Sequence, residues 1–536
     1  RYRAALAAQL AHDGVDGVVV LNCPVGVASP TDAARAVVEV CGERPKKPVL
    51  TSWVGGESVH AARQRLTAAR IPTYETPSQA VRGFMHLVEY QRSRDILMET
   101  PPSAPTSFTP DATMVRSALR KALDEGREWL SEPEAKAVLA AYGVPVVPTV
   151  EADTPAVAAD AAAGMAGPVA LKIRSPELTH KTEVGGVVLD LKGPEAVREA
   201  AEAMLARVRE LRPDARIDGF TVQPMVRRSG ALELIAGISV DAQFGPTVLF
   251  GHGGTAVEVL RDTAVALPPL NLHLAQELIA RTRVSRLLAG YRDRAPADSE
   301  AIALTLVKVA QLAADFAEIQ ELDINPLLAD AEGVIALDAR IRVARSDADP
   351  ASRLAILPYP KEMEETFEAD GRTLMLRPIV PEDEPTLQAG FAKLSPEEIR
   401  LRFLAPMKTL THMMAARFSQ IDYDREMALV LTEPGIPGRT EIYGVVRIGA
   451  DPDREKAEYA IVVRREMTGK GLGYRMMRRI IDYARARGIG MIYGDVLREN
   501  GRMLQMCGEL GFTRRAHPDD FELVHVELPL RNGISR

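Results

Sequence analysis

The feature that most limits the fold is a run of three alternating glycines, Gly469, Gly471 and Gly473. Before them, residues 458–464 read EYAIVVR, which is an apolar segment typical of a strand. After them, apolar side chains recur at intervals of three and four residues, which predicts a helix with one buried face. The residues on that face are Met477, Ile480, Ile481 and Ala484.

A loop of this kind is suited to an anion. Glycine lets the backbone turn tightly and brings its N–H groups close to a ligand. The helix that follows adds a partial positive charge at its N-terminus, so a diphosphate is the natural ligand. The G-x-G-x-G spacing departs from the G-x-G-x-x-G of dinucleotide-binding folds, and the loop lacks the GK[ST] of a P-loop. A glycine-rich turn without a ligand therefore stays a second interpretation of the loop alone.

The order of elements around the loop is more specific than the loop. A strand at 491–500 and a helical segment at 501–512 that ends in LGF follow the glycine helix. Residues 371–531 thereby resemble the GNAT acyltransferase family, although the family's Gln or Arg stands as Thr468 here. The resemblance implies acetyl-CoA or another acyl-CoA as donor. The implied contacts to this cofactor come from Ile461, Val462, Val463, Thr468, Gly469, Lys470, Gly471 and Gly473.

Acyl transfer to an amine needs a base, because a lysine ammonium is almost fully protonated near neutral pH. Glu458 begins the strand before the loop, and strand alternation places it on the face of Ala460 and Val462. The resemblance implies that Glu458 is the base and that Asn500 lies near the leaving thiolate. Two plainer interpretations remain open. Glu458 fits a solvated edge residue, and Asn500 fits a helix cap.

A second group of motifs lies in the middle of the chain. Lys172 stands near the end of the apolar strand 168–173, where a lysine can meet nucleotide phosphates, although this residue taken alone fits a surface lysine better. Asn325 and Asp338 lie near the ends of two consecutive predicted strands. Amide and carboxylate oxygens together suit Mg²⁺, which usually shares its ligands with ATP phosphates.

Residues 112–343 resemble the ATP-grasp domain of NDP-forming acyl-CoA synthetases, the relatives of succinyl-CoA ligase, because LKI, THK, VQPMV, ELIAG and ELDINPLL occur in family order. The resemblance implies ATP contacts from Lys172 and Glu233, and an adenine hinge at Gln223–Val226. It also implies Mg²⁺ at Asn325 and Asp338. In this comparison His180 matches a loop histidine that carries phosphate in active synthetases. Glu183 replaces the usual Asp, and Gly251–Gly254 is either an anion loop or a structural turn.

Residues 1–99 alternate short apolar runs with helical patterns, which predicts a parallel sheet covered by helices. They resemble the last flavodoxin-like subdomain of the same synthetases. Since the chain opens on Arg1 inside a helical pattern, we expect an N-terminal truncation, with two further subdomains upstream. Residues 100–112 predict a linker, and the polar residues 344–370 predict a connector. The predicted fold is therefore multidomain, of α/β and α+β class.

Composition excludes several classes of function. A net charge of −7 and a pI of about 5.9 argue against a general nucleic-acid binder. Apolar runs fall short of the roughly 18 residues that a membrane helix needs. Cys23, Cys41 and Cys507 show no metal-like or CxxC spacing, so we expect a reduced, cytoplasmic protein.

The combination of a synthetase-like body with a C-terminal GNAT domain resembles the Pat-type bacterial protein lysine acetyltransferases. This resemblance implies that exposed lysines of other proteins are the acceptors, AMP-forming acyl-CoA synthetases among them, and that the body is regulatory. The alternative is an active ADP-forming acyl-CoA ligase with an accessory GNAT domain. A binding protein with two inactive halves is a third interpretation. The sequence leaves an oligomer open.

Overall fold

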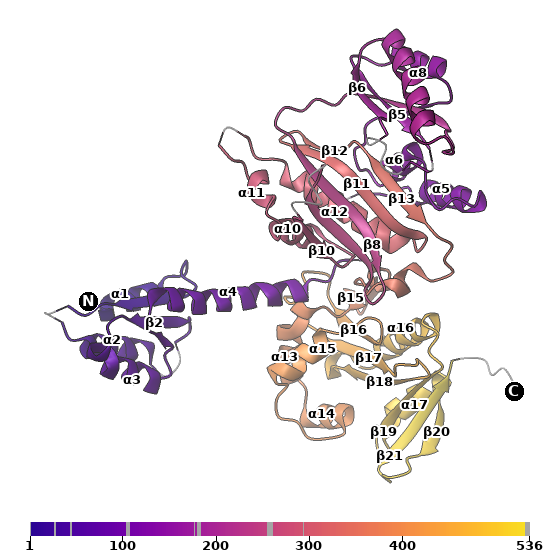
Figure 1. Ribbon diagram of the computed structural model, residues 1–536. Coiled ribbons are helices and arrows are strands. Elements are labelled where there is room, and N and C mark those ends of the chain that lie inside the picture. Colours follow the sequence, from indigo (N-terminus) through magenta and orange to yellow (C-terminus); the bar gives the residue numbers. More distant parts are fainter. Residues whose placement is uncertain are drawn as a thin grey trace. The chain divides into compact units, whose positions relative to one another are not determined.

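The computed structural model describes residues 2–25, 28–42, 45–102, 108–175, 177–178, 184–254, 261–292 and 294–530, without the side chains of 95–97 (Figure 1). The chain separates into two compact units, Arg1–Glu99 and Thr100–Arg536. None of the described helices combines the length and the apolar character that crossing a lipid bilayer requires.

The first unit is built on a parallel sheet. Its elements are α1 (Tyr2–Ala11), β1 (Val18–Asn22), α2 (Pro30–Cys41), β2 (Val49–Trp53), α3 (His60–Ala68), β3 (Thr73–Tyr74) and α4 (Pro77–Met98). The strands lie in the order β1, β2, β3, and every residue of the central β2 is buried. Helix α2 starts as the sequence indicates, with Ser29 accepting a hydrogen bond from the Asp32 N–H and Pro30 in the first turn. The predicted parallel-sheet subdomain is confirmed.

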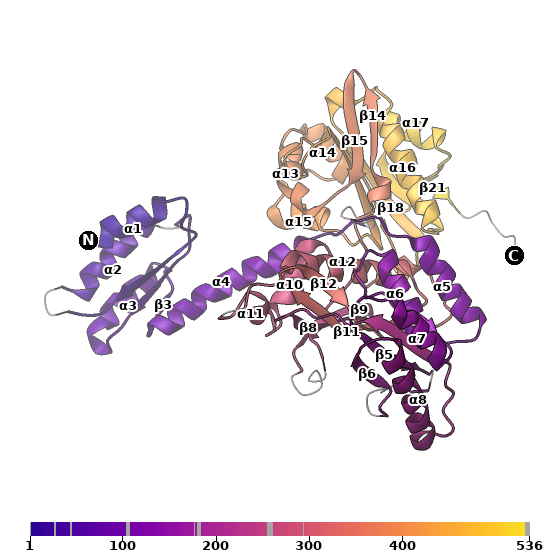
Figure 2. The ribbon, with the colours of Figure 1, turned by 90° about the horizontal axis from the view of Figure 1, so that it is seen from above.

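The middle of the chain forms two antiparallel sheets with helices against them (Figures 1 and 2). Its helices are α5 (Ala112–Asp124), α6 (Glu132–Ala141), α7 (Pro155–Ala163), α8 (Pro194–Leu211), α10 (Leu272–Ala280), α11 (Ser285–Leu288) and α12 (Ser299–Asp315). Its strands are β4 (Val150–Ala152), β5 (Val169–Arg174), β6 (Val187–Leu191), β7 (Gly219–Pro224), β8 (Leu232–Asp241), β9 (Gly245–His252), β10 (Thr263–Ala266), β11 (Ile319–Asp330), β12 (Gly333–Ala336) and β13 (Ala339–Val343).

The smaller of these sheets has the order β4-β7-β5-β6, and α7 and α8 pack against it. The larger has the order β10-β9-β8-β11-β12, with β13 also paired to β11. Helix α12 lies against β8, β9 and β12 and is buried around most of its circumference. A helix that is apolar on nearly all sides belongs in a core, and α12 is the centre of the largest one.

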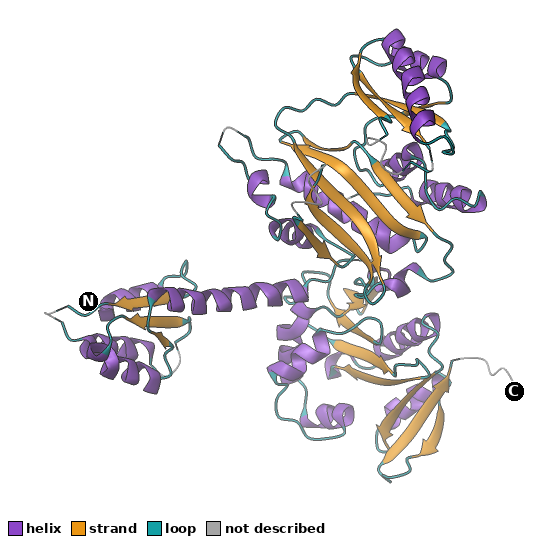
Figure 3. Cartoon of the chain, viewed as in Figure 1, coloured by secondary structure: helices purple, strands orange, loops and turns teal. Residues whose placement is uncertain are grey.

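The C-terminal part is a single eight-stranded sheet, coloured orange with its helices purple in Figure 3. Its strands are β14 (Glu365–Ala369), β15 (Arg372–Pro378), β16 (Glu426–Thr432), β17 (Gly444–Ala450), β18 (Lys456–Val463), β19 (Met491–Leu497), β20 (Thr513–Ala516) and β21 (Leu523–Pro529). Its helices are α13 (Glu384–Ala392), α14 (Pro396–Phe403), α15 (His412–Ser419), α16 (Leu472–Ala486) and α17 (Gly501–Glu509). The order is β14-β15-β16-β17-β18-β19-β21-β20. Among the described strands of this sheet, only β18 and β19 pair in parallel.

Candidate functional site

The glycine loop joins β18 to α16 and leaves its backbone open. Gly469 and Gly471 have φ angles of 77° and 74°, a left-handed backbone that favours glycine. A Cβ added to either residue meets no atom within 4 Å. No side chain caps α16, whose first residue is Leu472. The N–H groups of its first turn are therefore available to an anion, as the sequence analysis predicts for a diphosphate.

The other predicted loop residues use their side chains within the domain. The Thr468 hydroxyl donates a hydrogen bond of 2.7 Å to the Arg465 carbonyl. The Lys470 ammonium forms an ion pair with Asp370 in the turn between β14 and β15. Gly473 lies under the loop, because a Cβ there meets Met506 Sδ at 3.7 Å. In this loop, the groups that remain available to a ligand are backbone N–H groups more than these side chains.

Strands β18 and β19 diverge after a short parallel contact, as Figure 3 also shows. Their register contains three residue pairs, the last of which joins Glu458 to Tyr493. From residue 459 to 463, β18 continues alongside β17 without pairing to β19. The side chains of Ile461 and Val463 pack toward the core under α16, whereas Val462 faces the opposite side. The unpaired edge of β18 is the place predicted for the pantetheine arm of coenzyme A.

Glu458 lies at the point where the two strands part, and its side chain is exposed. Its charge reaches two neighbours. Burial and the positive charge of Arg447 together lower the pKa of Arg402 to about 10, and the negative charge of Glu458 opposes this shift. Burial raises the pKa of Tyr493, and Glu458 raises it further. The carboxylate therefore has a partly buried cation and a neutral phenol beside it, and its role as a base stays a prediction.

Asn500 caps α17, which is the plainer of its two sequence interpretations. Its side-chain oxygen accepts a hydrogen bond of 3.2 Å from the Met503 N–H. This oxygen satisfies one of the free donors at the helix start. A contact of Asn500 with the leaving thiolate stays a prediction.

A second cluster of polar groups is buried where α6 meets the smaller sheet of the middle region. Lys172 Nζ lies 2.7 Å from Glu132 Oε1 and 3.8 Å from Asp338 Oδ2. Lys136 Nζ lies 2.8 Å from the same Glu132 oxygen and 2.8 Å from Gln223 Oε1. Burial lowers the pKa of Lys136, and the negative charge of Glu132 opposes this shift. The structure thus brings together three predicted residues, Lys172, Gln223 and Asp338.

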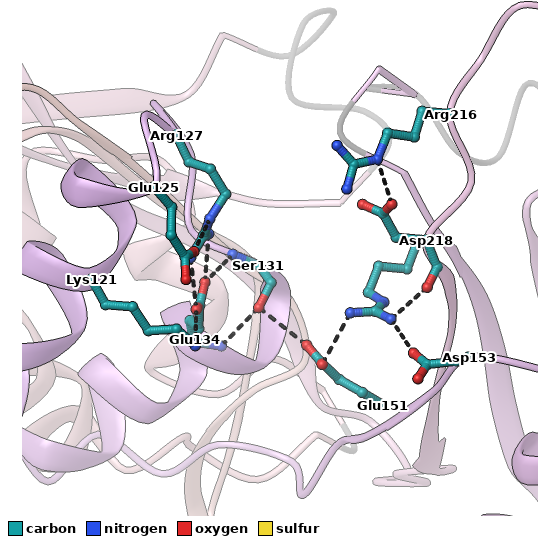
Figure 4. A network of polar contacts seen from close by, with 10 residues as sticks. Lys121, Glu125, Arg127, Ser131, Glu134, Glu151, Asp153, Arg216 and Asp218 are labelled. Carbon is teal, nitrogen blue, oxygen red and sulfur yellow. Dashed lines mark hydrogen bonds and ion pairs between the residues drawn. The ribbon is translucent and has the colours of Figure 1, made fainter.

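Glu132 and Lys136 are functional candidates that sequence reasoning missed. Ser131 and Glu134 form the predicted capping box at the start of α6, and Glu134 also receives two hydrogen bonds from Arg127, of 2.8 and 2.9 Å (Figure 4). This network fixes the helix that carries the buried pair. The available signal was the i, i+4 spacing of Glu132 and Lys136, which places both on one helix face.

Asn325 lies in the middle of β11, where the strand changes partners, and the prediction that it lies near a strand end is wrong, because β11 continues to Asp330; Asp338 lies in the short connection between β12 and β13. Just before Asn325, β11 pairs with β13 through Ile324 and Ala339, and just after it with β12 through Leu327 and Ala336. Among the described residues, no three His, Cys, Asp or Glu side chains gather as a metal site. One carboxylate and one amide oxygen fit a Mg²⁺ ion that takes its other ligands from phosphates and water.

Glu233 extends from β8 beside the loop that follows β9. Gly254 has a φ angle of 77°, which favours glycine, and a Cβ there would meet Glu233 Oε2 at 2.0 Å, so another residue would displace the Glu233 carboxylate. The Gly254 N–H donates to Asn325 Oδ1 at 2.9 Å, and the Gly253 N–H donates to the Glu233 carbonyl at 2.8 Å. These two amides are used within the domain, which favours the structural turn over the anion loop.

Two further residues complete the comparison with the sequence. His180, the predicted phosphate carrier, and its neighbour Glu183 lie outside the described residues. Asp323, which the sequence analysis did not single out, precedes Asn325 by two positions on β11. Burial, aided by the negative charges of Asp338 and Glu321 and opposed by the positive charge of Arg340, raises its pKa to about 6.

Two protein families match the chain. Residues 121–343 match the ATP-grasp domain family, and residues 401–512 match the GNAT acetyltransferase family. The beta subunit of the ADP-forming acetate–CoA ligase I of Pyrococcus furiosus is 38% identical over 226 residues, which are 42% of this chain and 96% of that subunit. The ADP-forming acetate–CoA ligase I of Archaeoglobus fulgidus is 33% identical over 341 residues, 64% of this chain and 48% of the relative.

The C-terminal part matches a different relative. An acetyltransferase of Pseudomonas aeruginosa is 30% identical over 161 residues, 30% of this chain and 86% of the relative. The chain spans about half the length of the first ligases that it matches, but nearly all of the Pyrococcus beta subunit. By its middle region the chain belongs to the ADP-forming acyl-CoA ligase family with an ATP-grasp domain, and by its C-terminal region to the GNAT acetyltransferases.

Proposed function

We propose that the C-terminal domain transfers an acyl group from acyl-CoA to lysine side chains of other proteins, AMP-forming acyl-CoA synthetases among them. The observation that carries this proposal is the position of Glu458 at the fork between β18 and β19, with the open glycine loop beyond the far end of β18. The five residue steps from Glu458 to Val463 span about 17 Å of strand. A donor that reaches both ends is therefore extended, like the pantetheine arm of coenzyme A.

The transfer needs one proton acceptor and one proton donor. Glu458 takes a proton from the acceptor ammonium, directly or through water, and the neutral nitrogen attacks the thioester carbonyl carbon. Free N–H groups on the unpaired edge of β18 stabilise the oxyanion. The carbon–sulfur bond then breaks, the nitrogen gives up its second proton to leave a neutral amide, and the coenzyme thiolate takes up a proton. Tyr493, beside Glu458, is a neutral phenol that is able to supply the thiolate's proton and to regain one from the nitrogen through water.

The ATP-grasp domain is proposed to bind ATP with Mg²⁺ and to regulate the transferase. Lys172 and Gln223 line the buried cluster that would receive the nucleotide, and Asn325 and Asp338 offer oxygens to the metal. When bound, Mg²⁺ would neutralise phosphate charge. Because Lys172 is paired with Glu132 and close to Asp338, nucleotide binding has to rearrange these contacts, and this rearrangement is a means of sensing.

The test incubates the whole protein with acetyl-CoA labelled in the acetyl group and a cell lysate. Label that mass spectrometry finds on the Nε atoms of particular protein lysines supports the proposal. Label confined to small amines contradicts the protein acceptor but keeps acyl transfer, and no label above a heat-inactivated control contradicts both. A parallel assay with purified AMP-forming acyl-CoA synthetase tests that class of acceptor, and its repetition with ATP and Mg²⁺ tests the regulation.

A second candidate function is ADP-forming acyl-CoA ligation. The buried cluster around Lys172 favours it, and so does the 38% identity to a ligase beta subunit. The test supplies ATP, acetate, CoA and Mg²⁺ and measures ADP and acetyl-CoA, with and without an added alpha subunit of such a ligase. Equal formation of ADP and acetyl-CoA supports ligation, whereas ATP binding without turnover in both mixtures supports a regulatory domain.

A further inference from the structure

The GNAT domain contains a small apolar cavity that the acyl-transfer mechanism above does not use. It lies between helices α13–α15 and strands β17 and β18, and its volume is about 60 Å³. That is about four times the roughly 15 Å³ that one water molecule needs. Its apolar wall includes Leu387, Phe391, Phe403, Phe418, Val445 and Val462. A short alkyl chain fits such a space better than water does, because few polar groups line the cavity.

The cavity adjoins the predicted reaction centre. Val462 lines it and lies on the same face of β18 as Glu458. Arg447, which also lines it, pairs across β17 and β18 with Ala460, the residue between those two on that face. The charges of Arg402 and Glu458 interact. The cavity therefore opens on the face of β18 that carries Glu458 and Ala460, where a group attached to the thioester would extend.

Three arginines reach this apolar wall, and two of them have carboxylate partners. Arg464 pairs with Glu441 and Glu466. Arg447 lies 3.3 Å from Glu426. Both therefore carry their charge in an ordinary ion pair.

Arg402 is different. It stacks on the Phe403 ring at 4.7 Å and has no hydrogen bond or ion pair with any residue that the structure describes. Arg402 is partly buried and lies near the like charge of Arg447. A partly desolvated cation without a hydrogen-bonded anion is costly, so a carboxylate that enters this cavity gains a strong partner.

We propose that this cavity receives the distal part of the acyl group and that Arg402 binds a carboxylate at its end, so that the acyl-CoA esters of short dicarboxylic acids, of which succinyl-CoA is the test case, are donors for the transferase. This inference rests on the proposed acyl transfer and names the class of donor. The chemical step is unchanged. The amine nitrogen attacks the thioester carbon, the carbon–sulfur bond breaks, and the whole carboxyacyl group moves to the acceptor.

Succinyl-CoA and butyryl-CoA make a sharp comparison, because both carry four-carbon chains and only the first ends in a carboxylate. The expected result is a kcat/KM for succinyl-CoA about ten-fold or more above that for butyryl-CoA, with acetyl-CoA as the reference donor. Equal values for the two donors, or a preference for butyryl-CoA, overturn the proposal. Absence of transfer from all three donors contradicts the proposed acyl transfer itself. This outcome differs from equal use of succinyl-CoA and butyryl-CoA, which contradicts only the donor class.

The variant Arg402→Met tests the named residue, since it keeps a long apolar side chain without the charge. We expect it to bring the succinyl-to-butyryl ratio of kcat/KM close to one. Arg400→Met is the matched control, because Arg400 lies on the same helix but is exposed and pairs with Glu499 and Glu522. This control should keep the wild-type ratio, and a ratio that stays high in Arg402→Met contradicts the proposal.

A binding measurement separates recognition from chemistry. Two thioether analogues that cannot transfer their chains, S-(3-carboxypropyl)-CoA and S-butyl-CoA, are titrated calorimetrically against both variants and the wild type. The carboxylate analogue should bind the wild type about ten-fold more tightly, and this advantage should be absent only in Arg402→Met. Equal binding of both analogues to the wild type contradicts the proposal. Circular dichroism of each variant establishes that it is folded.

Discussion

Lys172 and Glu132 form a buried ion pair, with 2.7 Å between Nζ and Oε1. Lys136, one helical turn from Glu132, forms a second ion pair with the same carboxylate oxygen. Lys172 comes from β5 and the other two residues from α6. One carboxylate oxygen therefore joins two ammonium groups across two elements of the ATP-grasp domain. Two predicted nucleotide contacts, Lys172 and Gln223, are held in place by a residue pair that has no place in the sequence motif.

The first prediction concerns this pair. Lys136→Met removes the ammonium group that contacts the Glu132 carboxylate and the Gln223 side chain. Lys172 still compensates the Glu132 charge, but Gln223 Oε1 loses its charged donor, so the free energy of unfolding of this domain should fall by about 2 kcal/mol. Hydrogen exchange of peptides from residues 121–343 in urea measures this. Lys121→Met is the control, since Lys121 is exposed at 3.6 Å from Glu134 and should cost less than about 1 kcal/mol.

The second prediction compares two glycines of the loop. Gly471→Ala puts a Cβ on a residue with a φ of 74°, in the open space predicted for the diphosphate. Gly473→Ala puts it in ordinary contact with Met506. We expect Gly471→Ala to raise the KM for acetyl-CoA about ten-fold or more, from strain of about 1–2 kcal/mol and lost approach of the phosphate. Gly473→Ala should change it less than about three-fold. A larger increase in KM for Gly473→Ala than for Gly471→Ala would contradict the predicted position of the diphosphate.

The third prediction concerns the cations beside the loop. Asp370 neutralises Lys470, and Glu365 neutralises Arg475. Asp370→Asn frees one cation near the loop and keeps a residue that tolerates the φ of 54° there. The KM for acetyl-CoA should fall by up to about five-fold at low ionic strength and return toward the wild-type value in 0.5 M salt, roughly as surface charges are screened. The exposed Glu368→Gln, whose partner is Thr373, serves as control and should show no such salt dependence.

The fourth prediction assigns the base. Glu458→Ala should lower kcat for acyl transfer by about 100-fold or more, because the amine then has no positioned proton acceptor. Binding of acetyl-CoA, measured by calorimetry, should be unchanged within about two-fold. Wild-type turnover of this variant across the range from roughly pH 6 to 9 would end the assignment.

The fifth prediction concerns pH and stability. Burial raises the pKa of Asp315, which accepts hydrogen bonds from Tyr142 at 2.6 Å and Gln311 at 2.8 Å. A carboxyl group with a raised pKa in the folded state favours folding most below its unfolded pKa, and this contribution is lost as the pH rises through its folded pKa. The wild type should therefore gain stability relative to the pH-independent Asp315→Asn variant as the pH falls from 7 toward about 4. Denaturant midpoints at several pH values measure the difference, and an unchanged difference contradicts the assigned burial.

The sequence predicts well the parts of this protein that local chemistry defines. The capping box of Ser131 and Glu134, the glycine turn and the buried face of α16 all follow from residue spacing, and the structure contains them. Strand β14 was missed because its five residues, ETFEA, are mostly polar and lie in the segment 344–370 that predicts a connector. Its place in the sheet comes from pairing with β15, which no local pattern reveals.

The candidate sites divide in the same way. That Asn325 and Asp338 lie on strands that pair was predictable, because the strands are consecutive in the sequence, but the continuation of β11 past Asn325 was not. The contact of Lys136 with Gln223 joins residues 87 positions apart and depends on packing. The apolar cavity beside Val462 is likewise made by elements distant in sequence, α13–α15 and two strands, so its arginines carried no signal in the chain.

The brief parallel contact of β18 with β19 has a thermodynamic consequence. Three residue pairs join what are otherwise two antiparallel sheets, so few backbone hydrogen bonds hold the two parts together at this seam. A coenzyme that fills the fork supplies hydrogen bonds where a strand would continue, and its binding therefore stabilises the folded domain. At a hundred times its dissociation constant it adds about 2.7 kcal/mol to the stability of the folded state. Substrate supply would then govern how long the transferase survives as well as how fast it works.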